Sequence, residues 1–226
     1  MFSGITSGVT ATAASVPGLY VGTSGWSYPS WRPDFYPAGT KPADFLRFYA
    51  EHFGTVELNT TGYRLPREEL FERWAGQTPE GFVFAPKLNA HSRSDFGTFA
   101  ERVGLLGERL GPIRVLINAA RDEGLLTLVL GSFAPSTSLA FDFRHESWEG
   151  IELPSNAVRV GSLEGAAAFR YLRLREPPYD DAELEEWAGR LRPVLDDGLR
   201  VYCYFKHEDE PTAPRYAQRL LELLAG

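Results

Sequence analysis

The sequence predicts an α/β protein built as a single (β/α)8 barrel, the TIM-barrel fold, shortened around its fifth and sixth βα units. Apolar runs alternate with amphipathic stretches from Leu19 almost to the end of the 226-residue chain. Strands that alternate with helices are typical of a parallel sheet. About eight such repeats in roughly 200 residues fit a closed barrel better than a doubly wound sheet. Between Trp148 and Phe169 there is room for one strand but not for two helices.

Eight runs have the length and composition of strands. They are rich in β-branched and aromatic residues, and most of them alternate between two kinds of side chain. Gly residues, Pro residues and polar clusters separate them from the stretches that follow. These predicted strands are residues 19–24, 55–59, 82–87, 113–118, 139–146, 157–161, 169–175 and 200–207.

Six stretches between the strands carry apolar residues at helical spacing. Pro42 lies near the start of the first, as suits a helical first turn, and Asp95 is a plausible N-cap for the third. Pro193 is expected to kink or end the fifth. The predicted helices are residues 41–53, 66–77, 95–110, 122–132, 180–197 and 213–224.

Composition limits the class of protein further. Hydrophobic residues make up 43% of the chain and the formal net charge is −7, which favours a folded core and argues against a broad basic face for nucleic acid or membrane. No run reaches the roughly 18 apolar residues of a membrane span. Residues 1–17 lack the features of a signal peptide, so we expect a flexible tail followed by one domain over residues 18–226, in a cytoplasmic protein.

Four segments resemble, in order, the signature segments of the YecE-like family. They are GTSGWSYPSWRPDFYP, VELNTTGYRLP, FDFRHESW and VYCYFKHE. The resemblance runs over residues 19–222 and implies a TIM-barrel domain of unknown function. The chain departs from the family pattern at Gly62, where an aromatic residue is usual, at LINAA (116–120), where Gln-Leu-Pro-Pro is common, and at Asp142, where Glu is usual.

Polar side chains share one parity along the predicted strands, near their carboxyl ends. In a barrel alternate residues point inward, and active sites form at the carboxyl ends of the strands. Because the apolar parity suits contact with the helices, the polar set is expected to face the interior. That set includes Glu57, Asn59, Lys87, Asp142, Arg144, Arg173, Tyr204 and Lys206.

Positive charge exceeds negative charge in this inward set. Buried charges must pair or face a wet pocket, and the carboxylates of Glu57 and Asp142 offset only two of the cations. The surplus predicts a phosphate or carboxylate ligand held by Arg side chains. The candidate catalytic residues are Glu57, Lys87 and His91. The candidate ligand-binding residues are Trp26, Tyr28, Asn59, Tyr63, Arg64, Asp142, Arg144, Arg173, Tyr204, Lys206 and His207.

An aromatic loop, GWSYPSWRPDFYP, follows the first predicted strand and therefore lies at the predicted ligand end. Trp26 and Tyr28 come directly after the strand and are expected to line the pocket opposite the cations. Trp31 and Phe35 lie further along and are expected to pack on the first helix. The alternative is that all these rings only plug the end of the barrel.

Three classes of function remain open from the sequence. The first is an enzyme, a hydrolase or lyase, that acts on a phosphorylated or carboxylated substrate. The second is a protein that binds or processes nucleic acid or another polyanion, with bases stacked on the aromatic loop. The third is a noncatalytic small-anion binder, such as a sensor, or a partner-binding scaffold. Separately, the alternative to a site role for Glu57 and Asp142 is that their pairs with Arg are structural salt-bridge layers inside the barrel.

No cofactor is evident from the sequence, because nucleotide-binding loops and catalytic serine elbows are missing from it. A divalent metal held by Glu57, His91, Asp142 and His207 is conceivable, but their spacing matches no ligand motif. We therefore predict no metal ligands.

Overall fold

The computed structural model describes residues 16–91, 94–206 and 210–226, and these contain eight strands. Each strand lies within or beside a run predicted from the sequence. Their bounds are β1 Leu19–Thr23, β2 Thr55–Leu58, β3 Val83–Asn89, β4 Ile113–Ile117, β5 Leu139–Phe143, β6 Ala157–Arg159, β7 Phe169–Leu174 and β8 Arg200–Phe205.

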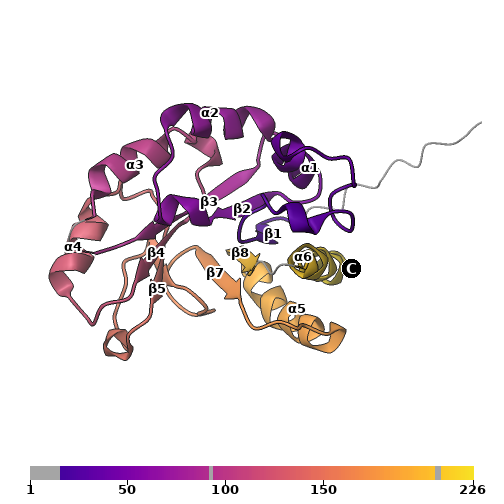
Figure 1. The fold of residues 1–226 in the computed structure, drawn as a ribbon. Coiled ribbons are helices and arrows are strands. Elements are labelled where there is room, and N and C mark those ends of the chain that lie inside the picture. Colours follow the sequence, from indigo (N-terminus) through magenta and orange to yellow (C-terminus); the bar gives the residue numbers. More distant parts are fainter. Residues whose placement is uncertain (1–15, 92–93, 207–209) are drawn as a thin grey trace, which may run out of the picture.

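Six α-helices lie on the outside of the strands, with α1 to α4 beside β2 to β5, and α5 and α6 beside β7, β8 and β1 (Figure 1). Their bounds are α1 Phe45–Ala50, α2 Glu68–Gln77, α3 Phe96–Gly104, α4 Glu123–Gly131, α5 Asp181–Asp196 and α6 Thr212–Ala225. The predicted N-cap is confirmed, since the Asp95 carboxylate accepts a hydrogen bond from Thr98 N at 2.9 Å. Helix α5 ends within one turn of Pro193. None of the described helices is long and apolar enough to cross a membrane.

Five short 3-10 helices occupy the connections in the described residues: η1 Pro29–Trp31, η2 Pro42–Asp44, η3 Asn59–Gly62, η4 Gly107–Arg109 and η5 Glu146–Trp148. The sequence predicted single long helices over 41–53 and 95–110. The structure divides the first into η2 and α1, and the second into α3 and η4.

The strands form two parallel sheets, of order β2-β3-β4-β5-β6 and β1-β8-β7. Ser24, just after β1, makes a single parallel bridge to Glu57 of β2. Gly22 permits this approach, because a Cβ there would lie 2.2 Å from the Thr55 carbonyl oxygen. Between β6 and β7, Gly161 N donates to Tyr171 O at 2.9 Å, and no ladder joins these two strands in the described residues. The α/β fold is confirmed, whereas a continuous closed barrel stays a prediction.

The predicted shortening is confirmed. No α-helix occurs between β5 and β7, a stretch that the structure describes in full, and Figure 1 shows no long helix on this side. The guanidinium of Arg170 binds the chain there by donating to the carbonyls of Leu163, Gly165, Ala167 and Phe169 at 2.6–3.0 Å. One buried side chain thus satisfies carbonyl groups that have no helix to pair them.

Two apolar clusters fill the molecule. The larger lies between the strands and the helices. The smaller is formed by strand residues of the opposite parity, from both sheets: Val83, Ala85, Ala140, Val158, Phe169, Tyr171, Tyr202 and Tyr204, together with Ala167. The smaller cluster therefore packs the two sheets against each other, and it underlies the polar side chains at the carboxyl ends of the strands.

Candidate functional site

A hollow of about 510 Å³ opens at the carboxyl ends of the strands and is called here the cationic hollow. It contains six predicted site residues, drawn from five different segments of the chain. Its lining residues are Asn59, Tyr63, Lys87, Arg114, Leu116, Arg144, Arg173, Arg175, Glu176 and Lys206. Six of these are basic and one is acidic, so the surplus of positive charge predicted from strand parity lies in one place.

The carboxylate of Glu57, with no exposed surface, is held by three donors at the base of the hollow. Its Oε1 accepts from Arg114 Nη1 at 3.1 Å and from Arg173 Nε at 2.9 Å. Its Oε2 accepts from the Tyr171 hydroxyl at 2.7 Å. A fully buried carboxylate is tolerated only with this degree of pairing.

This pairing decides the protonation state of Glu57. Burial opposes ionisation, but the charges of Arg114 and Arg173 and the hydrogen bonds from Tyr171 and Arg173 outweigh it and hold the pKa of Glu57 below its usual range. The Tyr171 hydroxyl has a pKa well above its usual value, because it is buried beside this carboxylate. Glu57 is therefore ionised at neutral pH and carries no proton to donate.

Arg114 is the central cation of the network and was missed by the sequence analysis. Besides Glu57, it binds Asp142: its Nε and Nη2 both lie 2.9 Å from Asp142 Oδ2. Burial lowers the pKa of Arg114, but the nearby carboxylates outweigh this and leave it raised. The sequence did contain a signal for this role: Arg114 is the one charged residue in an otherwise apolar strand, and it lies on the same face of that strand as Leu116.

Exposure rises from the base of the hollow to its mouth. The side chain of Arg114 is 3% exposed and that of Arg173 is 9% exposed. Arg144 binds the same Asp142 oxygen at 2.9 Å from the outer side and is 31% exposed. Arg175 and Lys206 are exposed at the mouth. The ion-paired Arg114 and Arg173 therefore form the base, and the more exposed cations lie nearest to solvent.

Lys87 is the exception to this gradient, because it is only 4% exposed yet makes no ion pair with any described residue. Its Nζ lies 4.2 Å from the ring centroid of Tyr63, which is itself 80% exposed. The stem of Lys87 runs against Gly62, where a Cβ would meet Cγ and Cδ at 2.9 Å. The glycine that departs from the family pattern is thus what lets Lys87 lie here.

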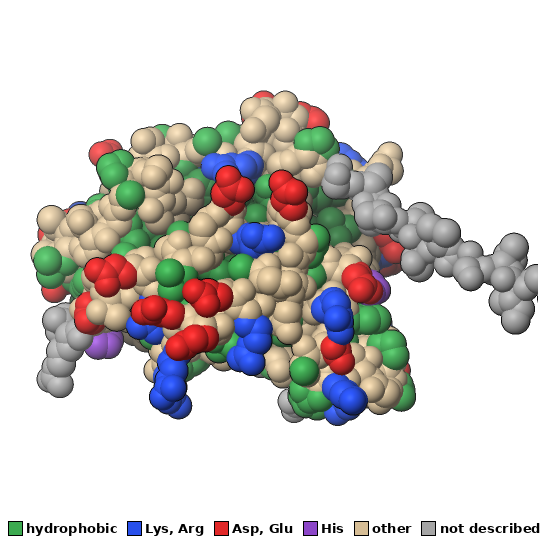
Figure 2. All heavy atoms as spheres, turned by 90° about the horizontal axis from the view of Figure 1, so that it is seen from above, with side chains coloured by type: hydrophobic (Ala, Val, Ile, Leu, Met, Phe, Trp, Pro, Cys, Tyr) green, Lys and Arg blue, Asp and Glu red, His purple; other side chains and the backbone are tan. Residues whose placement is uncertain are grey.

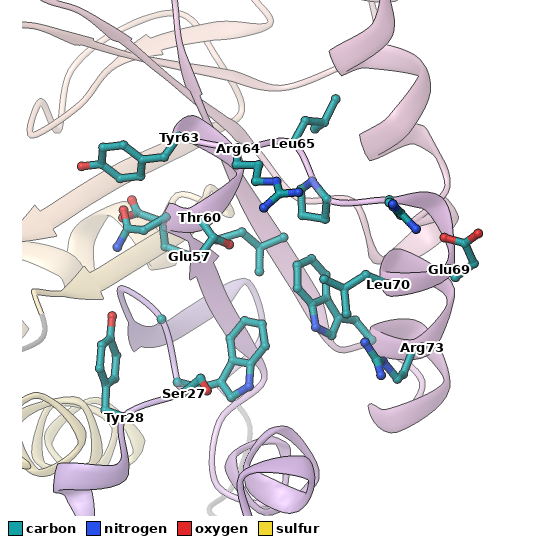
Figure 3. Close-up of a pocket in the computed structure, with 17 residues that line it drawn as sticks. Ser27, Tyr28, Glu57, Thr60, Tyr63, Arg64, Leu65, Glu69, Leu70 and Arg73 are labelled. Atoms are coloured by element: carbon teal, nitrogen blue, oxygen red, sulfur yellow. The ribbon is translucent and has the colours of Figure 1, made fainter.

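A second hollow of about 870 Å³, called here the aromatic groove, adjoins the first and shares Asn59 and Tyr63 with it. It lies between the loop after β1, the end of β2 and helix α2 (Figure 3). Its other lining residues are Gly25, Trp26, Ser27, Tyr28, Glu57, Leu58, Thr60, Arg64, Leu65, Pro66, Arg67, Glu69, Leu70, Arg73 and Trp74.

The aromatic loop divides as the sequence predicted. Trp26 and Tyr28 are half-buried and line the groove, with the Trp26 ring edge-on to Trp74 at 5.4 Å. The Tyr28 hydroxyl donates to Ser24 O at 2.9 Å, and burial together with the nearby Glu57 charge raises its pKa to about 12. Trp31 is fully buried and Phe35 packs against the helix α1 region, as expected.

Two predicted site residues that the structure describes lie elsewhere. His91 is exposed in the turn after β3, and it does not line either of the two hollows as the described residues form them. Tyr204 is fully buried in the smaller core cluster, where its hydroxyl lies 2.7 Å from Thr55 Oγ1. His207 lies outside the described residues. Among the described residues, no cluster of three or more His, Cys, Asp or Glu side chains is arranged to hold a metal ion.

Comparison with protein families places most of the chain in a known family. Residues 20–160 and 151–226 match the family described as protein of unknown function DUF72. Among curated proteins, UPF0759 protein YunF of Bacillus subtilis is 25% identical over 185 residues, which are 79% of this chain and 61% of that protein. UPF0759 protein YecE of Escherichia coli K12 is 40% identical over 72 residues, 32% of this chain and 24% of YecE. The chain thus spans about three fifths of the length of YunF.

Solved structures of the same family share the fold. A DUF72 family protein from Enterococcus faecalis V583 superposes with a TM-score of 0.69 at 15% identity, covering 91% of this chain and 95% of that one. A DUF72 family protein from Thermotoga maritima MSB8 gives 0.62 at 20% identity, covering 91% and 97%.

Proposed function

This chain belongs to the DUF72 family of proteins of unknown function. From the geometry of its site, we propose that it is an enzyme that binds a small organic anion in the cationic hollow and acts on it. The anionic group is a phosphate or a carboxylate. The ligand enters at the carboxyl ends of the strands, where the exposed cations of the hollow meet solvent.

One observation carries this proposal: among the residues that the structure describes, the hollow holds more positive than negative charge. Even with Lys206 left out of the count, five basic side chains line it, while the described carboxylates in or beside it are Glu57, Asp142 and Glu176. In a chain with a net charge of −7, general surface composition does not account for such a local surplus. An anion held by Arg in bidentate geometry supplies the missing negative charge.

The network assigns different roles to the candidate catalytic residues. Glu57 is ionised and fully engaged by three donors, so we assign it the positioning of Arg114 and Arg173. Lys87 Nζ borders the hollow without a carboxylate partner among the described residues, so it is the group that acts on the ligand, as proton donor or nucleophile. His91 is left outside this assignment. Hydrolysis and elimination are both consistent with a single amine in a cationic site.

The test measures binding of methyl phosphate and of succinate by calorimetry and thermal unfolding. A ligand at about 100 times its Kd stabilises the fold by about 2.7 kcal/mol, which raises Tm by about 5–10 °C in a chain of this size. Arg144→Ala and Lys206→Ala are each expected to weaken binding about tenfold. Lys41→Ala is the matched control, because Lys41 is exposed and lies outside both hollows. If neither anion binds, or the control weakens binding equally, the proposal is wrong.

Single-stranded nucleic acid is the alternative ligand, since aromatic rings of the groove adjoin the cations. The net charge of −7 argues against it, and on the face that Figure 2 shows, acidic and basic side chains are interspersed. An oligonucleotide that binds at low salt and dissociates steeply as salt rises favours this alternative. A noncatalytic anion binder is distinguished by stabilisation without turnover of any phosphate monoester offered.

A further inference from the structure

The aromatic groove differs in chemistry from the cationic hollow beside it. Its walls contain the rings of Trp26 and Trp74 and the side chains of Leu58, Leu65 and Leu70. Figure 3 shows Leu70 on α2 on the same side of the groove as Arg73 and Glu69, opposite Tyr28. A groove with apolar walls and a few charged groups at its edge is typical of sites for small organic molecules.

The two hollows form one continuous surface rather than two separate sites. Asn59 and Tyr63 line both of them. The Asn59 amide is held in this position, because its Nδ2 donates to Ser24 O at 3.2 Å and its Oδ1 accepts from Arg114 Nη1 at 3.4 Å. The Tyr63 ring lies over the Lys87 amine, and the residue is 80% exposed. A ligand can therefore reach from one hollow into the other past these two residues.

We infer that the two hollows are two subsites for one amphipathic organic anion, with its phosphate or carboxylate in the cationic hollow and an aromatic or apolar group in the aromatic groove. This inference rests on the proposed function and names its ligand class. The groove volume of about 870 Å³ lies within the range of about 300–1,000 Å³ found for small-molecule sites. A bare inorganic anion leaves that volume and the two tryptophan rings unused.

Charge and burial argue for an apolar group with no negative charge of its own in the inner part of the groove. The Glu57 carboxylate lines the groove next to the shared wall, but Arg114, Arg173 and Tyr171 already engage it, so it offers no partner to a polar group of the ligand. The groove's own cations, Arg64, Arg67 and Arg73, are exposed at the outer edge, where Glu69 partly offsets them. A ligand with one anionic group fits both hollows, because that group can lie beyond Asn59 among the cations of the cationic hollow while the apolar group lies in the aromatic groove.

The experiment compares two monoesters that differ only in the ester group, methyl phosphate and phenyl phosphate. Burial of the phenyl ring against Trp26 and the leucines is expected to tighten binding about tenfold to a hundredfold over methyl phosphate. Trp26→Ala should remove most of that gain, and so weaken phenyl phosphate binding far more than methyl phosphate binding. Trp187→Ala is the matched control, because Trp187 stacks on Arg190 in α5, away from both hollows. Leu70→Gln, at a half-buried position of α2, repeats the test should Trp26→Ala fail to fold.

The outcomes separate the two proposals. Equal affinity for both esters overturns the two-subsite inference but leaves the anion site intact. A phenyl gain that survives both Trp26→Ala and Leu70→Gln also overturns it, because the ring then lies outside the groove. Failure of both esters and of succinate to bind overturns the proposed function and this inference together. A phenyl gain lost in either groove variant and kept in Trp187→Ala supports the inference.

Discussion

The cationic hollow and the aromatic groove share a wall, yet different forces hold them in shape. The base of the hollow is a network of buried charges in which Arg114 joins Glu57 to Asp142. The wall of the groove is a stack of rings in which Trp74 contacts Trp26, Phe71 and Phe84. Removing one member of a buried charge network leaves its partner buried and unpaired, which costs a large part of the free energy of unfolding. Removing part of a ring cluster lowers that free energy in proportion to the apolar area removed. The hollow should therefore be the more fragile of the two.

The largest effect is expected from Glu57→Gln. The neutral amide leaves the buried guanidiniums of Arg114 and Arg173 without their shared carboxylate, and breaking a buried pair in this way costs about 3–5 kcal/mol. Urea unfolding measures the change. Glu69→Gln, at the exposed edge of the groove, is the control and should change stability by less than about 0.5 kcal/mol. Similar small losses for both variants would show that the network does not stabilise the fold.

Trp74→Ala tests the groove by the same measurement. Trp74 is 7% exposed and lies at the open edge of the core, so we expect a loss of about 3 kcal/mol, the lower end of the range for buried aromatic residues. Trp187→Ala in α5 should cost about 1 kcal/mol or less, because its ring is only half-buried. A Trp74→Ala loss larger than that of Glu57→Gln reverses the ranking of the two regions.

Acid should weaken the hollow before the groove. The pKa of Glu57 is held below its ordinary value of 4.5 in the folded protein, so its contribution to stability is complete above that value. The contribution is lost as pH falls from about 4.5 through the lower folded-state pKa. Unfolding free energies measured between pH 7 and pH 3 should fall less steeply for Glu57→Gln than for the unmodified chain. Parallel curves contradict the assignment of an ionised Glu57.

The smallest effect on stability is expected at the shared wall, from Gly62→Ala. The new Cβ meets the flexible stem of Lys87 at 2.9 Å, so Lys87 shifts and stability changes by only about 0.5 kcal/mol. Methyl phosphate should nevertheless bind a few-fold more weakly, because the Lys87 amine is displaced. Gly76→Ala in α2 has open space around its Cβ and should raise stability by about 0.5–1 kcal/mol with unchanged binding. Unchanged binding in Gly62→Ala would remove Lys87 from the anion site.

Much of the candidate site was predictable because strand parity is a local property. Lys87, Arg144, Arg173 and Lys206 were placed together from alternation along separate strands, and the structure brings them to one hollow. Tyr204 shares that parity but lies deeper, in the core cluster, because parity gives the face of a residue and not its depth along the strand. For a residue in a loop, the sequence gives neither its face nor its depth. His91, which was predicted to be in the site, is exposed in a turn.

The sequence by itself determined the order of strands and helices, the missing helices before β7, the division of the aromatic loop and the surplus of positive charge. These follow from periodicity, length and composition, which are properties of short segments. Only the tertiary structure decided which charges pair, because Arg114 meets partners 57 and 28 residues away in the chain. It also decided that the surplus cations and the exposed rings lie in two adjoining hollows. That arrangement depends on how the two sheets pack, which no single segment encodes.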